Sequence, residues 1–417
     1  MKTNLVQPII CVVGLGYVGL PLAEAFSNHF HVIGYDIDKK RVKELKLHHS
    51  NQNILFINNP KQIKLANVII IAVPTPITKS KQPDLSYIIN ATKIVASNMR
   101  TGCIVSLEST VYPGVTEEIV KPILEKSGLQ CCKDFKLAYC PERINPGDTS
   151  HTIDKITKVV SGMDEETTDT VAQIYAKISP SIFKAKSIRT AEAAKVIENI
   201  QRDLNISLVN ELSIIFQLIG LNTKDVLEAA NTKWNFHRYS PGLVGGHCIP
   251  VDPYYLVHKS EESGYHPQVI LAGRTINDYM PKHVANMTVR ALNDFDKKIK
   301  GSHALIMGVA YKENVPDIRE TPVVDLIREL QSYGIKITAL DPLVNNIKAK
   351  FGIDAILHLD QLEKIDCLIL AVYHDNFRSI TLDMIRKVMN DNPILIDIRG
   401  VFDKEEATSA GFHYITL

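Results

Sequence analysis

The 417-residue sequence lacks the features that mark membrane-spanning and secreted chains. No apolar run reaches the length of about 18 residues that suggests a transmembrane helix, and the apolar N-terminus has no small-residue cleavage site of the kind that follows a secretory signal. The seven cysteines are odd in number and form no C-x-x-C pair, which argues against a disulfide framework and against a zinc site. We therefore expect a cytoplasmic chain with reduced thiols and no bound metal.

The sequence also lacks an excess of charge of either sign. Its 47 Lys and Arg residues nearly balance its 46 Asp and Glu residues, for a formal net charge of +1. This balance provides no overall field that would attract nucleic acid or an anionic membrane, so neither is expected as a partner. A locally basic pocket is still compatible with it.

The pattern of apolar residues divides the chain into three parts, too long together for one ordinary core. Residues 1–189 alternate short apolar runs with amphipathic segments, which is typical of a parallel α/β sheet. Residues 190–296 are predicted to be mainly helical, with one long helix from Thr190 to about Leu221, because that stretch has no proline and only a late glycine. Residues 297–417 return to the α/β pattern. The predicted fold class is therefore α/β, with two Rossmann-like parallel-sheet domains joined by a central helical domain.

The apolar runs predict individual strands in both α/β parts. In the first part they are Ile9–Val13, His31–Tyr35, Val68–Val73, Cys103–Glu108, Lys136–Tyr139, Lys158–Ser161 and Ile182–Lys186. Helices are expected at Tyr17–Asn28 and Val115–Lys126. In the last part the strands are HALIMGVA, KITALDP, CLILAVYHD and PILIDIRG, with a helix from Pro322. The connector between residues 46 and 64 is short, which puts the second α/β unit, or at least its surface helix, in doubt.

A glycine-rich turn follows the first predicted strand and opens a helix. Gly14, Gly16 and Gly19 have the G-x-G-x-x-G spacing, which allows a tight turn, close approach of a pyrophosphate and close packing of helix on strand. About twenty residues later, Asp36 ends the second strand, where a carboxylate can accept the ribose hydroxyls. Asp36 and Asp38 together should repel a 2′-phosphate. The alternative is a glycine turn that serves packing only; the whole arrangement favours NAD.

A second glycine-rich segment, residues 241–252, reads PGLVGGHCIPVD. Its glycines allow close approach to a ligand and leave the thiol of Cys248 accessible, and a thiolate can attack an aldehyde or acyl carbon. The adjacent His247 is a less favoured candidate for a base, because neighbours on an extended loop point apart. A cysteine is otherwise often a small buried hydrophobe, an interpretation that we keep for Cys11, Cys103 and Cys367.

Lys195 and Asn199 are four residues apart on the predicted long helix and so share one face. An ammonium beside an amide suits stabilisation of a developing oxyanion. An exposed lysine and a surface amide have the same spacing, so spacing alone leaves both interpretations open.

Seven segments, in this order, resemble motifs of the UDP-glucose/GDP-mannose dehydrogenase family: GLGYVGLP, AVPTP, ESTVYPG, YCPERINPGD, AEAAKVIEN, PGLVGGHCIPVDPYYL and YKENVPDIRET. The resemblance covers essentially the whole chain. It implies a four-electron oxidation of the C6 hydroxyl of a sugar nucleotide, with two NAD per sugar. A hydride can leave the alcohol but not the resulting aldehyde; addition of Cys248 restores a tetrahedral thiohemiacetal, from which a second hydride leaves to give a thioester.

The resemblance also implies roles for other catalytic residues. Lys195 and Asn199 hold the oxyanion, Asp252 and Thr110 take part in proton transfer with an ordered water, and Glu142 activates the water that hydrolyses the thioester. A structural alternative for Glu142 is a pair with a basic neighbour such as Arg143.

Contacts to the cofactor and the UDP-sugar are likewise implied by the resemblance. The cofactor contacts are Gly14, Gly16, Gly19, Asp36, Arg41, Thr75 and Arg319. The substrate contacts are Gly245, Lys312, Arg399, Arg238 and Tyr239. Lys312 and Arg399 suit a diphosphate by their charge.

The variants CPERINPGD and PGLVGGHC resemble the branch that acts on UDP-N-acetylhexosamines, including bacterial enzymes for capsule and O-antigen polysaccharide. The UDP-glucose branch typically has phenylalanine and serine where this chain has Arg143 and His247, and a second glutamate where it has Pro146. UDP-GlcNAc or UDP-GalNAc is therefore the expected substrate, and UDP-glucose or UDP-ManNAc the alternative. The resemblance further implies a homodimer through the central helical domain.

Two other functions compete with this one. A single-hydride β-hydroxyacid or 6-phosphogluconate-type dehydrogenase would combine a Rossmann domain with a lysine–asparagine helix but would need no nucleophilic cysteine. A catalytically silent nucleotide sensor would not require Cys248, Lys195, Asn199, Glu142 and Asp252 together. The number of NADH molecules made per substrate separates the first alternative, and any steady NADH production excludes the second.

Overall fold

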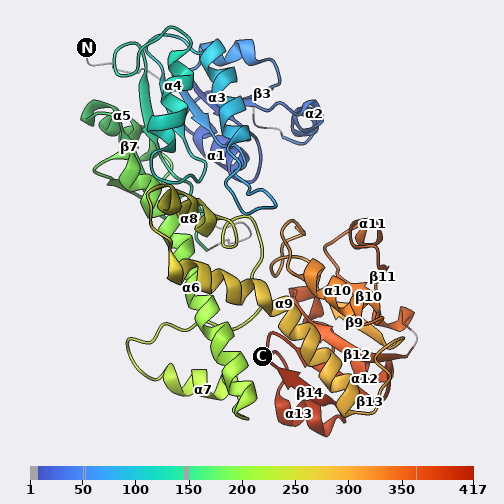
Figure 1. The fold of residues 1–417 in the computed structure, drawn as a ribbon. Coiled ribbons are helices and arrows are strands. Elements are labelled where there is room, and N and C mark those ends of the chain that lie inside the picture. The colour runs from blue at the N-terminus through green and yellow to red at the C-terminus, as the bar shows by residue number, and fades with distance from the viewer. Residues whose placement is uncertain (1–7, 50, 52, 145–149, 363) are drawn as a thin grey trace. The chain divides into compact units, whose positions relative to one another are not determined.

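The computed structural model describes residues 8–49, 51, 53–144, 150–362 and 364–417, so Pro146 lies outside the described residues. The chain forms two compact units (Figure 1): residues 1–199 with 251–266, and residues 200–250 with 267–417. The long helix α6 (Ile188–Leu218) contributes its first part to unit 1 and its remainder to unit 2. The predicted long helix is thus confirmed, with both ends shifted by two or three residues. The division at 190 and 297 stays a prediction.

Unit 1 is built on an eight-stranded sheet with the order β3-β2-β1-β4-β5-β6-β7-β8. The strands are β1 (Ile10–Val13), β2 (Val32–Tyr35), β3 (Ile54–Ile57), β4 (Val68–Ile71), β5 (Ile104–Leu107), β6 (Lys136–Tyr139), β7 (Thr157–Gly162) and β8 (Ser181–Lys184). All seven strands predicted for this part are present. The sheet departs from the predicted parallel arrangement at one place, because β7 runs antiparallel to β6.

Helices connect these strands. They are α1 (Gly19–Ser27), α2 (Lys39–His48), α3 (Ser86–Asn98), α4 (Lys121–Glu125), α5 (Glu165–Tyr175) and, from the later segment, α8 (Asp252–Glu262). A π-helical turn, η2 (Thr116–Val120), leads directly into α4, so the predicted helix over 115–126 is present with a widened first turn. The second α/β unit is intact despite its short connector: β3 pairs with β2, and a 3-10 helix, η1 (Pro60–Leu65), takes the place of a full crossover helix.

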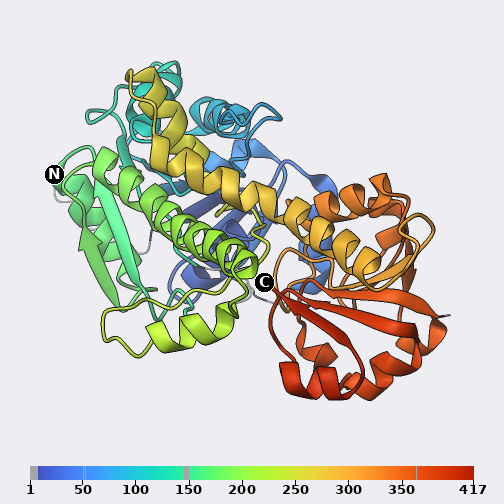
Figure 2. The same cartoon turned by 60° about the horizontal axis from the view of Figure 1, so that its bottom comes forward.

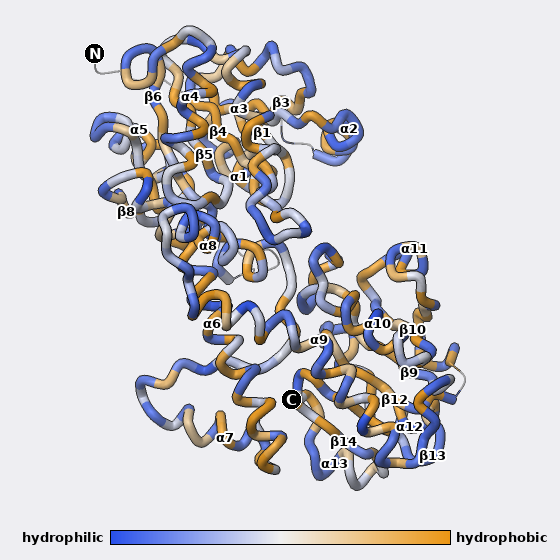
Figure 3. The backbone as a smooth tube through the Cα atoms, in the orientation of Figure 1, coloured by the Kyte–Doolittle hydropathy of each residue, from blue (hydrophilic) through white to orange (hydrophobic). Residues whose placement is uncertain are grey.

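The sheet of unit 1 is buried on both faces. Along β4, Val68 and Ile70 pack into one core and Ile69 and Ile71 into the opposite one, because successive side chains of a strand point to opposite faces. Figure 3 shows this strand as a hydrophobic segment in the middle of the unit, whereas the surface helix α2 is hydrophilic. Continuous apolar strands of this kind are typical of parallel sheets covered by helices on both sides.

Unit 2 contains a six-stranded parallel sheet with the order β11-β10-β9-β12-β13-β14. Its strands are β9 (His303–Met307), β10 (Lys336–Leu340), β11 (Asp354–Ile356), β12 (Ile365–Leu370), β13 (Met389–Asp397) and β14 (His413–Thr416), and its helices beyond α6 are α7 (Thr223–Ala230), α9 (Gln268–Asp294), α10 (Val323–Ser332), α11 (Ile347–Phe351), α12 (Leu382–Lys387) and α13 (Lys404–Ser409). The four strands and the helix predicted here are confirmed. The two edge strands β11 and β14 were not predicted, because they are short and only partly buried.

Helices α6 and α9 lie side by side within unit 2 (Figure 2). Where they meet, the buried Asp203 carboxylate accepts hydrogen bonds from Arg274 Nη1 at 2.6 Å and Asn277 Nδ2 at 2.8 Å. A Cβ atom on Gly273 would lie 2.5 Å from a side-chain carbon of Leu204, so glycine lets the two helices approach closely. In the described part of the chain, no helix combines the length and apolar character that crossing a bilayer requires.

Both sheets contain the strand order 3-2-1-4-5-6 in their own numbering, with the order reversing beside the first strand. Ligands of open α/β sheets bind at such a switch point, outside the carboxyl ends of the strands. The ends of β1 and β4 in unit 1, and of β9 and β12 in unit 2, are therefore the places where binding residues are expected.

Candidate active site

The glycine turn after β1 is as tight as its spacing predicts. Gly14 has a φ of +98°, and a Cβ atom there would lie 2.4 Å from the carbonyl oxygen of Ala72. A Cβ atom on Gly19 would lie 1.8 Å from the carbonyl oxygen of Gly14, so α1 packs directly on the turn. By contrast, a Cβ atom on Gly16 would meet nothing within 4 Å. The open space lies at the glycine that should face a pyrophosphate.

Asp36 binds the glycine turn and the start of the next helix. Its Oδ2 accepts a hydrogen bond from Leu15 N at 2.8 Å, and its Oδ1 accepts one from Asp38 N at 2.8 Å. A carboxylate has about four acceptor positions, so two remain for the ribose hydroxyls that this side chain is predicted to hold. Arg41 Nε lies 3.4 Å from the carbonyl oxygen of Leu15, beside the same turn. These residues fit a dinucleotide.

Asp38 has a local role that the sequence argument missed. Its Oδ1 accepts hydrogen bonds from Lys40 N at 2.8 Å and Arg41 N at 3.4 Å, which caps the N-terminus of α2. Aspartate is a preferred residue at this position because it satisfies backbone donors that the helix leaves unpaired.

Thr75 is half-buried in the loop that follows β4. A side chain from α8 stabilises this loop, since Tyr255 Oη donates a hydrogen bond to the carbonyl oxygen of Pro76 at 3.0 Å. Tyr255 is fully buried. It belongs to the VDPYYL segment, whose apolar character was the only indication of a packing role.

Asp252 is the first residue of α8 and is 2% exposed. Its Oδ2 accepts a hydrogen bond from Asn199 Nδ2 at 2.5 Å. Burial raises its pKa to about 6, against the opposing effects of the Lys195 charge and the Asn199 hydrogen bond. Lys195 and Asn199, which share a face of α6 by their spacing, therefore act on one buried carboxylate.

Thr110 is half-buried in the loop after β5, and a residue that the sequence argument did not single out stabilises this loop. Glu192 on α6 is fully buried, and its two oxygens accept hydrogen bonds from Gly114 N at 2.6 Å and Thr116 N at 2.9 Å. Burial raises the pKa of Glu192 to about 6. The sequence offered one indication that Glu192 faces the site, namely its position three residues before Lys195 on the same helix. Ser109, next to Thr110, bonds through Oγ to both backbone groups of Val73.

Glu142 lies just after β6 and is 5% exposed. Its Oε1 accepts hydrogen bonds from Arg143 N at 2.6 Å and Ile144 N at 2.7 Å, and its Oε2 lies 3.5 Å from Lys158 Nζ. The Arg143 guanidinium instead pairs with Glu198 at 2.9 Å. The ion pair that the structure gives Glu142 is thus with Lys158, not with the sequence neighbour Arg143.

Cys248 lies in unit 2, where its side chain is exposed. The loop before it is anchored to α6, because Asn210 Oδ1 accepts a hydrogen bond from Gly242 N at 2.8 Å and Asn210 Nδ2 donates to Gly242 O at 3.1 Å. A Cβ atom on Gly245 would lie 2.8 Å from the carbonyl oxygen of Glu320. The glycine at 245 is therefore required for packing against the loop before α10, a reason that the expectation of ligand approach did not include.

His247 and Arg319 meet at one carboxylate. His247 Nε2 lies 3.2 Å from Asp317 Oδ2, and Arg319 forms a bidentate contact with the same carboxylate, with Nη2 to Oδ2 at 2.7 Å. Burial alone would raise the pKa of Asp317, but the hydrogen bonds from Arg319 outweigh it and lower the pKa to about 2. In this arrangement the His247 imidazole contacts Asp317. Arg319, which is predicted to close over NAD, is bound to the same Asp317 carboxylate.

The residues predicted to contact UDP lie in unit 2. Lys312 is half-buried in the loop after β9, and Arg399 follows β13 and pairs with Glu313 at 2.8 Å. Arg238 is exposed and Tyr239 half-buried in the segment after α7.

The turn after the first strand of the second sheet, β9, has the same arrangement as the turn after β1: a glycine in close contact with the neighbouring strand's loop, and an aspartate that binds the turn. A Cβ atom on Gly308 would lie 2.2 Å from the carbonyl oxygen of Val372, and Asp341 Oδ2 accepts a hydrogen bond from Val309 N at 2.7 Å. Asp341 is buried and also bonds the imidazole of His374 at 3.1 Å. Because the Asp341 carboxylate is enclosed, it is not available to a ribose in the way predicted for Asp36, so this end of the second sheet differs from the predicted dinucleotide site.

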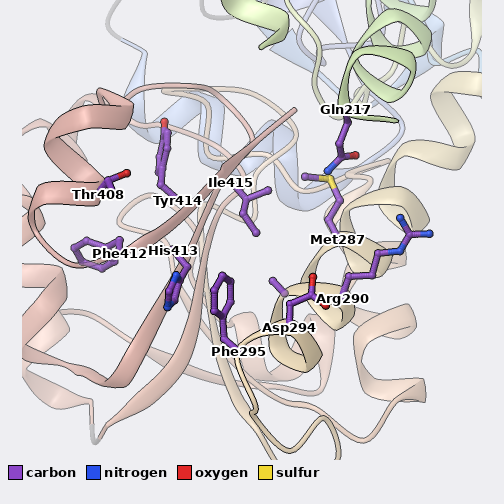
Figure 4. A pocket seen from close by; sticks show the side chains of 11 residues that line it. Gln217, Met287, Arg290, Asp294, Phe295, Thr408, Phe412, His413, Tyr414 and Ile415 are labelled. Carbon is purple, nitrogen blue, oxygen red and sulfur yellow. The ribbon is translucent and has the colours of Figure 1, made fainter. Parts of the chain in front are cut away.

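A pocket in unit 2 lies apart from all of these residues (Figure 4). It has a volume of about 410 Å³ and is lined by α9, the β14 region and the end of α6, with Arg290 and Asp294 among aromatic side chains such as Phe412. No predicted site residue lines it. Among the described residues, no group of three His, Cys, Asp or Glu side chains gathers as a metal site.

The predicted site residues are thus divided between the units. Unit 1 holds the glycine turn, Asp36, Arg41, Thr75, Thr110, Glu142, Lys195, Asn199 and Asp252, and unit 2 holds Arg238, Tyr239, Gly245, Cys248, Lys312, Arg319 and Arg399. Their catalytic and binding roles stay predictions.

Comparison with known proteins finds three domain models of one family along the chain. Residues 9–54 and 46–179 match the NAD binding domain of the UDP-glucose/GDP-mannose dehydrogenase family, residues 189–279 its central domain, and residues 305–404 its UDP binding domain. Protein CapL of Staphylococcus aureus is 47% identical over 95% of this chain and 97% of its own length. UDP-N-acetyl-D-glucosamine 6-dehydrogenase of Pseudomonas aeruginosa is 45% identical over 95% of this chain and 98% of its own length.

A solved structure gives the same result for the fold. UDP-D-ManNAc dehydrogenase from Pyrococcus horikoshii superposes with a TM-score of 0.89 at 29% identity and covers 98% of both chains. The chain therefore belongs to the UDP-glucose/GDP-mannose dehydrogenase family and is an NAD-dependent UDP-sugar dehydrogenase.

Proposed function

We propose that the chain oxidises the C6 hydroxyl of a UDP-N-acetylhexosamine, UDP-GlcNAc or UDP-GalNAc, to the uronic acid, for surface polysaccharides such as capsule or O-antigen. The observation that carries this proposal is the buried carboxylate of Asp252, which is joined to Asn199 and influenced by Lys195, four residues after the exposed thiol of Cys248. A proton acceptor thus contacts an oxyanion-stabilising pair on α6 and lies four residues along the chain from a nucleophile.

The first oxidation converts the C6 alcohol to an aldehyde. When bound, NAD supplies the hydride acceptor for both oxidations. The hydroxyl proton must leave as the hydride does, and the Asp252 carboxylate, whose pKa is about 6, is mostly ionised near neutral pH and suited to accept it through an ordered water. Lys195 and Asn199 stabilise the alkoxide that develops on the substrate oxygen.

The second oxidation requires Cys248. Its sulfur adds to the aldehyde carbon, and the carbonyl oxygen takes a proton, so the product is a thiohemiacetal. Loss of a hydride from C6 and of the hydroxyl proton leaves a thioester. Water, deprotonated by Glu142, then attacks the acyl carbon and releases the carboxylate and the free thiol. The sum is one alcohol, one water and two NAD⁺ consumed, and one carboxylate, two NADH and three protons formed.

The preference for an N-acetylhexosamine is supported by the relatives, one of which acts by its name on UDP-N-acetyl-D-glucosamine. UDP-glucose and UDP-ManNAc are the alternatives within the family. We expect the highest kcat/KM with UDP-GlcNAc or UDP-GalNAc when a panel of UDP-sugars is followed by NADH absorbance, and two NADH per sugar consumed. A clear maximum with UDP-glucose would refute the substrate, and one NADH per sugar would refute the four-electron reaction.

A homodimer through the central helical part belongs to the same proposal. Large apolar side chains are exposed along the second half of α6 and the segments after it: Leu208, Ile215, Leu218, Ile219, Leu221 and Trp234. Exposed apolar surface of this kind marks interaction sites. Light scattering should give the mass of a dimer, Leu218→Glu should shift it toward the monomer, and Leu357→Glu, at an exposed position on the UDP-binding part, should not. A monomeric unmodified protein would refute the dimer.

A cytoplasmic location completes the proposal, because the nucleophile must stay reduced. Cys248 is exposed, and exposed thiols persist in compartments where glutathione and thioredoxin keep them reduced. When cells are fractionated and each fraction is assayed, we expect the dehydrogenase activity in the membrane-free cytoplasmic extract. Activity confined to another fraction would contradict this location.

A further inference from the structure

Lys158 is a fully buried lysine that the reaction scheme does not use. It lies on β7, is 1% exposed, and faces three side chains from three other segments. Its Nζ lies 2.7 Å from Glu108 Oε2 and 3.5 Å from Glu142 Oε2, and 4.9 Å from the centre of the Tyr175 ring. A buried ammonium carries a large desolvation cost, and a lysine is rarely kept in such a place unless it is paired.

The two carboxylates around Lys158 are bound differently. Glu108 has Lys158 on one oxygen and the Tyr175 hydroxyl on the other, so both of its oxygens are held inside the protein. Glu142 has two backbone N–H groups on Oε1, from Arg143 and Ile144, and within the described ranges of the chain its Oε2 is paired with Lys158. The contact at 3.5 Å is longer than the one to Glu108, so Oε2 has room for a further hydrogen bond.

The charges of the cluster do not balance when both acids are ionised. One ammonium faces two carboxylates, and the other titratable groups near it, Cys140 after β6 and Tyr175 on α5, are neutral because burial raises the pKa of both. Burial likewise raises the pKa of Glu108 to about 7, even with Lys158 beside it. A proton on Glu108 removes the excess negative charge and leaves the ammonium to Glu142.

We propose that Lys158 is a positioning residue for thioester hydrolysis: it pairs with the Glu142 carboxylate and aligns it to take a proton from water, while Glu108 holds the Lys158 ammonium from the other side. This inference rests on the proposed role of Glu142. No atom of Lys158 needs to touch the substrate. Its ammonium lies 3.5 Å from Oε2, and together with the two backbone donors on Oε1 it fixes the direction of the Glu142 carboxylate.

The test is Lys158→Met, which keeps length and volume but removes the charge. Rapid mixing of the UDP-sugar with NAD should still give a burst of about two NADH per active site, because neither hydride transfer uses Lys158. Steady turnover should fall by about tenfold or more, and intact-mass measurement should find the sugar nucleotide bound to the protein. Lys158→Arg should restore much of the turnover.

Two further variants separate a loss of charge from a loss of fold. Lys158→Met combined with Glu108→Gln removes the buried pair on both sides, so the protein should fold even if the single variant does not, and hydrolysis should still be slow. Lys136→Met is the matched control: Lys136 is on the neighbouring strand β6 and pairs near the surface with Asp164 at 2.8 Å, so burst and turnover should be unchanged.

The outcomes distinguish this inference from the function on which it rests. If Glu142→Gln accumulates acyl-enzyme but the folded Lys158 variants turn over normally, or lose the burst together with turnover, only the role of Lys158 is refuted. If Glu142→Gln accumulates no acyl-enzyme, the proposed role of Glu142 is refuted and that of Lys158 with it.

Discussion

Replacement of Asp252 by asparagine should stabilise the protein near neutral pH while it abolishes activity. Asp252 is 2% exposed, and burial raises its pKa from 3.8 to about 6. A carboxyl whose pKa is higher in the folded than in the unfolded protein destabilises the fold at pH values above the folded pKa, because its ionised form is then buried. Below the unfolded pKa this cost is absent. A difference of about two in pKa corresponds to roughly 3 kcal/mol of unfolding free energy.

The asparagine variant escapes this cost but leaves Lys195 without its anion. We therefore expect a net gain of about 1–3 kcal/mol at pH 7.5, or roughly 2–10 °C in the apparent melting temperature of a unit of this size. As the pH falls through 6 toward 4, Asp252 of the unmodified protein takes up its proton, the cost disappears, and the two melting curves should approach each other.

The assay is thermal unfolding followed by circular dichroism at several pH values. The matched control is Asp169→Asn, since Asp169 is a half-exposed acid of α5 paired with Lys184, and surface pairs contribute about 0–1 kcal/mol. A melting temperature of Asp252→Asn that is unchanged or lower at pH 7.5, or a gain that does not shrink at acid pH, would refute the reasoning. So would a variant that still forms the uronic acid.

Three further changes test the remaining parts of the site. Cys248→Ala should abolish uronate formation and leave NAD binding intact by fluorescence titration; near-normal uronate production would contradict covalent catalysis. Asp36→Ala should weaken the preference for NAD, since the unmodified enzyme should have a much higher kcat/KM with NAD than with NADP; comparable values in the unmodified enzyme would disprove the cofactor assignment. Glu142→Gln should retain the burst of about two NADH per site and accumulate acyl-enzyme on Cys248, whereas a folded variant without burst or adduct would exclude Glu142 from hydrolysis.

Local sequence patterns were sufficient for most of the architecture. Each strand that was predicted from an apolar run is present in the structure, because strands buried on both faces are apolar without interruption. The absence of proline from residues 190–218 predicted the long helix α6, and the spacing of Gly14, Gly16 and Gly19 predicted a turn whose close contacts exclude any Cβ atom at two of these positions. Short edge strands such as β11 were missed, because an edge needs few apolar residues.

The tertiary structure decided how the polar side chains are used. Lys158 and Glu108 are fifty residues apart, and nothing in either segment indicates that they form a buried pair with Glu142 sixteen residues before Lys158. Glu192 is another example, since its partners at Gly114 and Thr116 lie on a distant loop. The sequence by itself determined the elements and the chemical groups, because hydrophobic periodicity and glycine conformation are local properties. Which carboxylate is buried, which cation balances it and which proton it holds depend on contacts between distant segments, and only the folded chain brings those together.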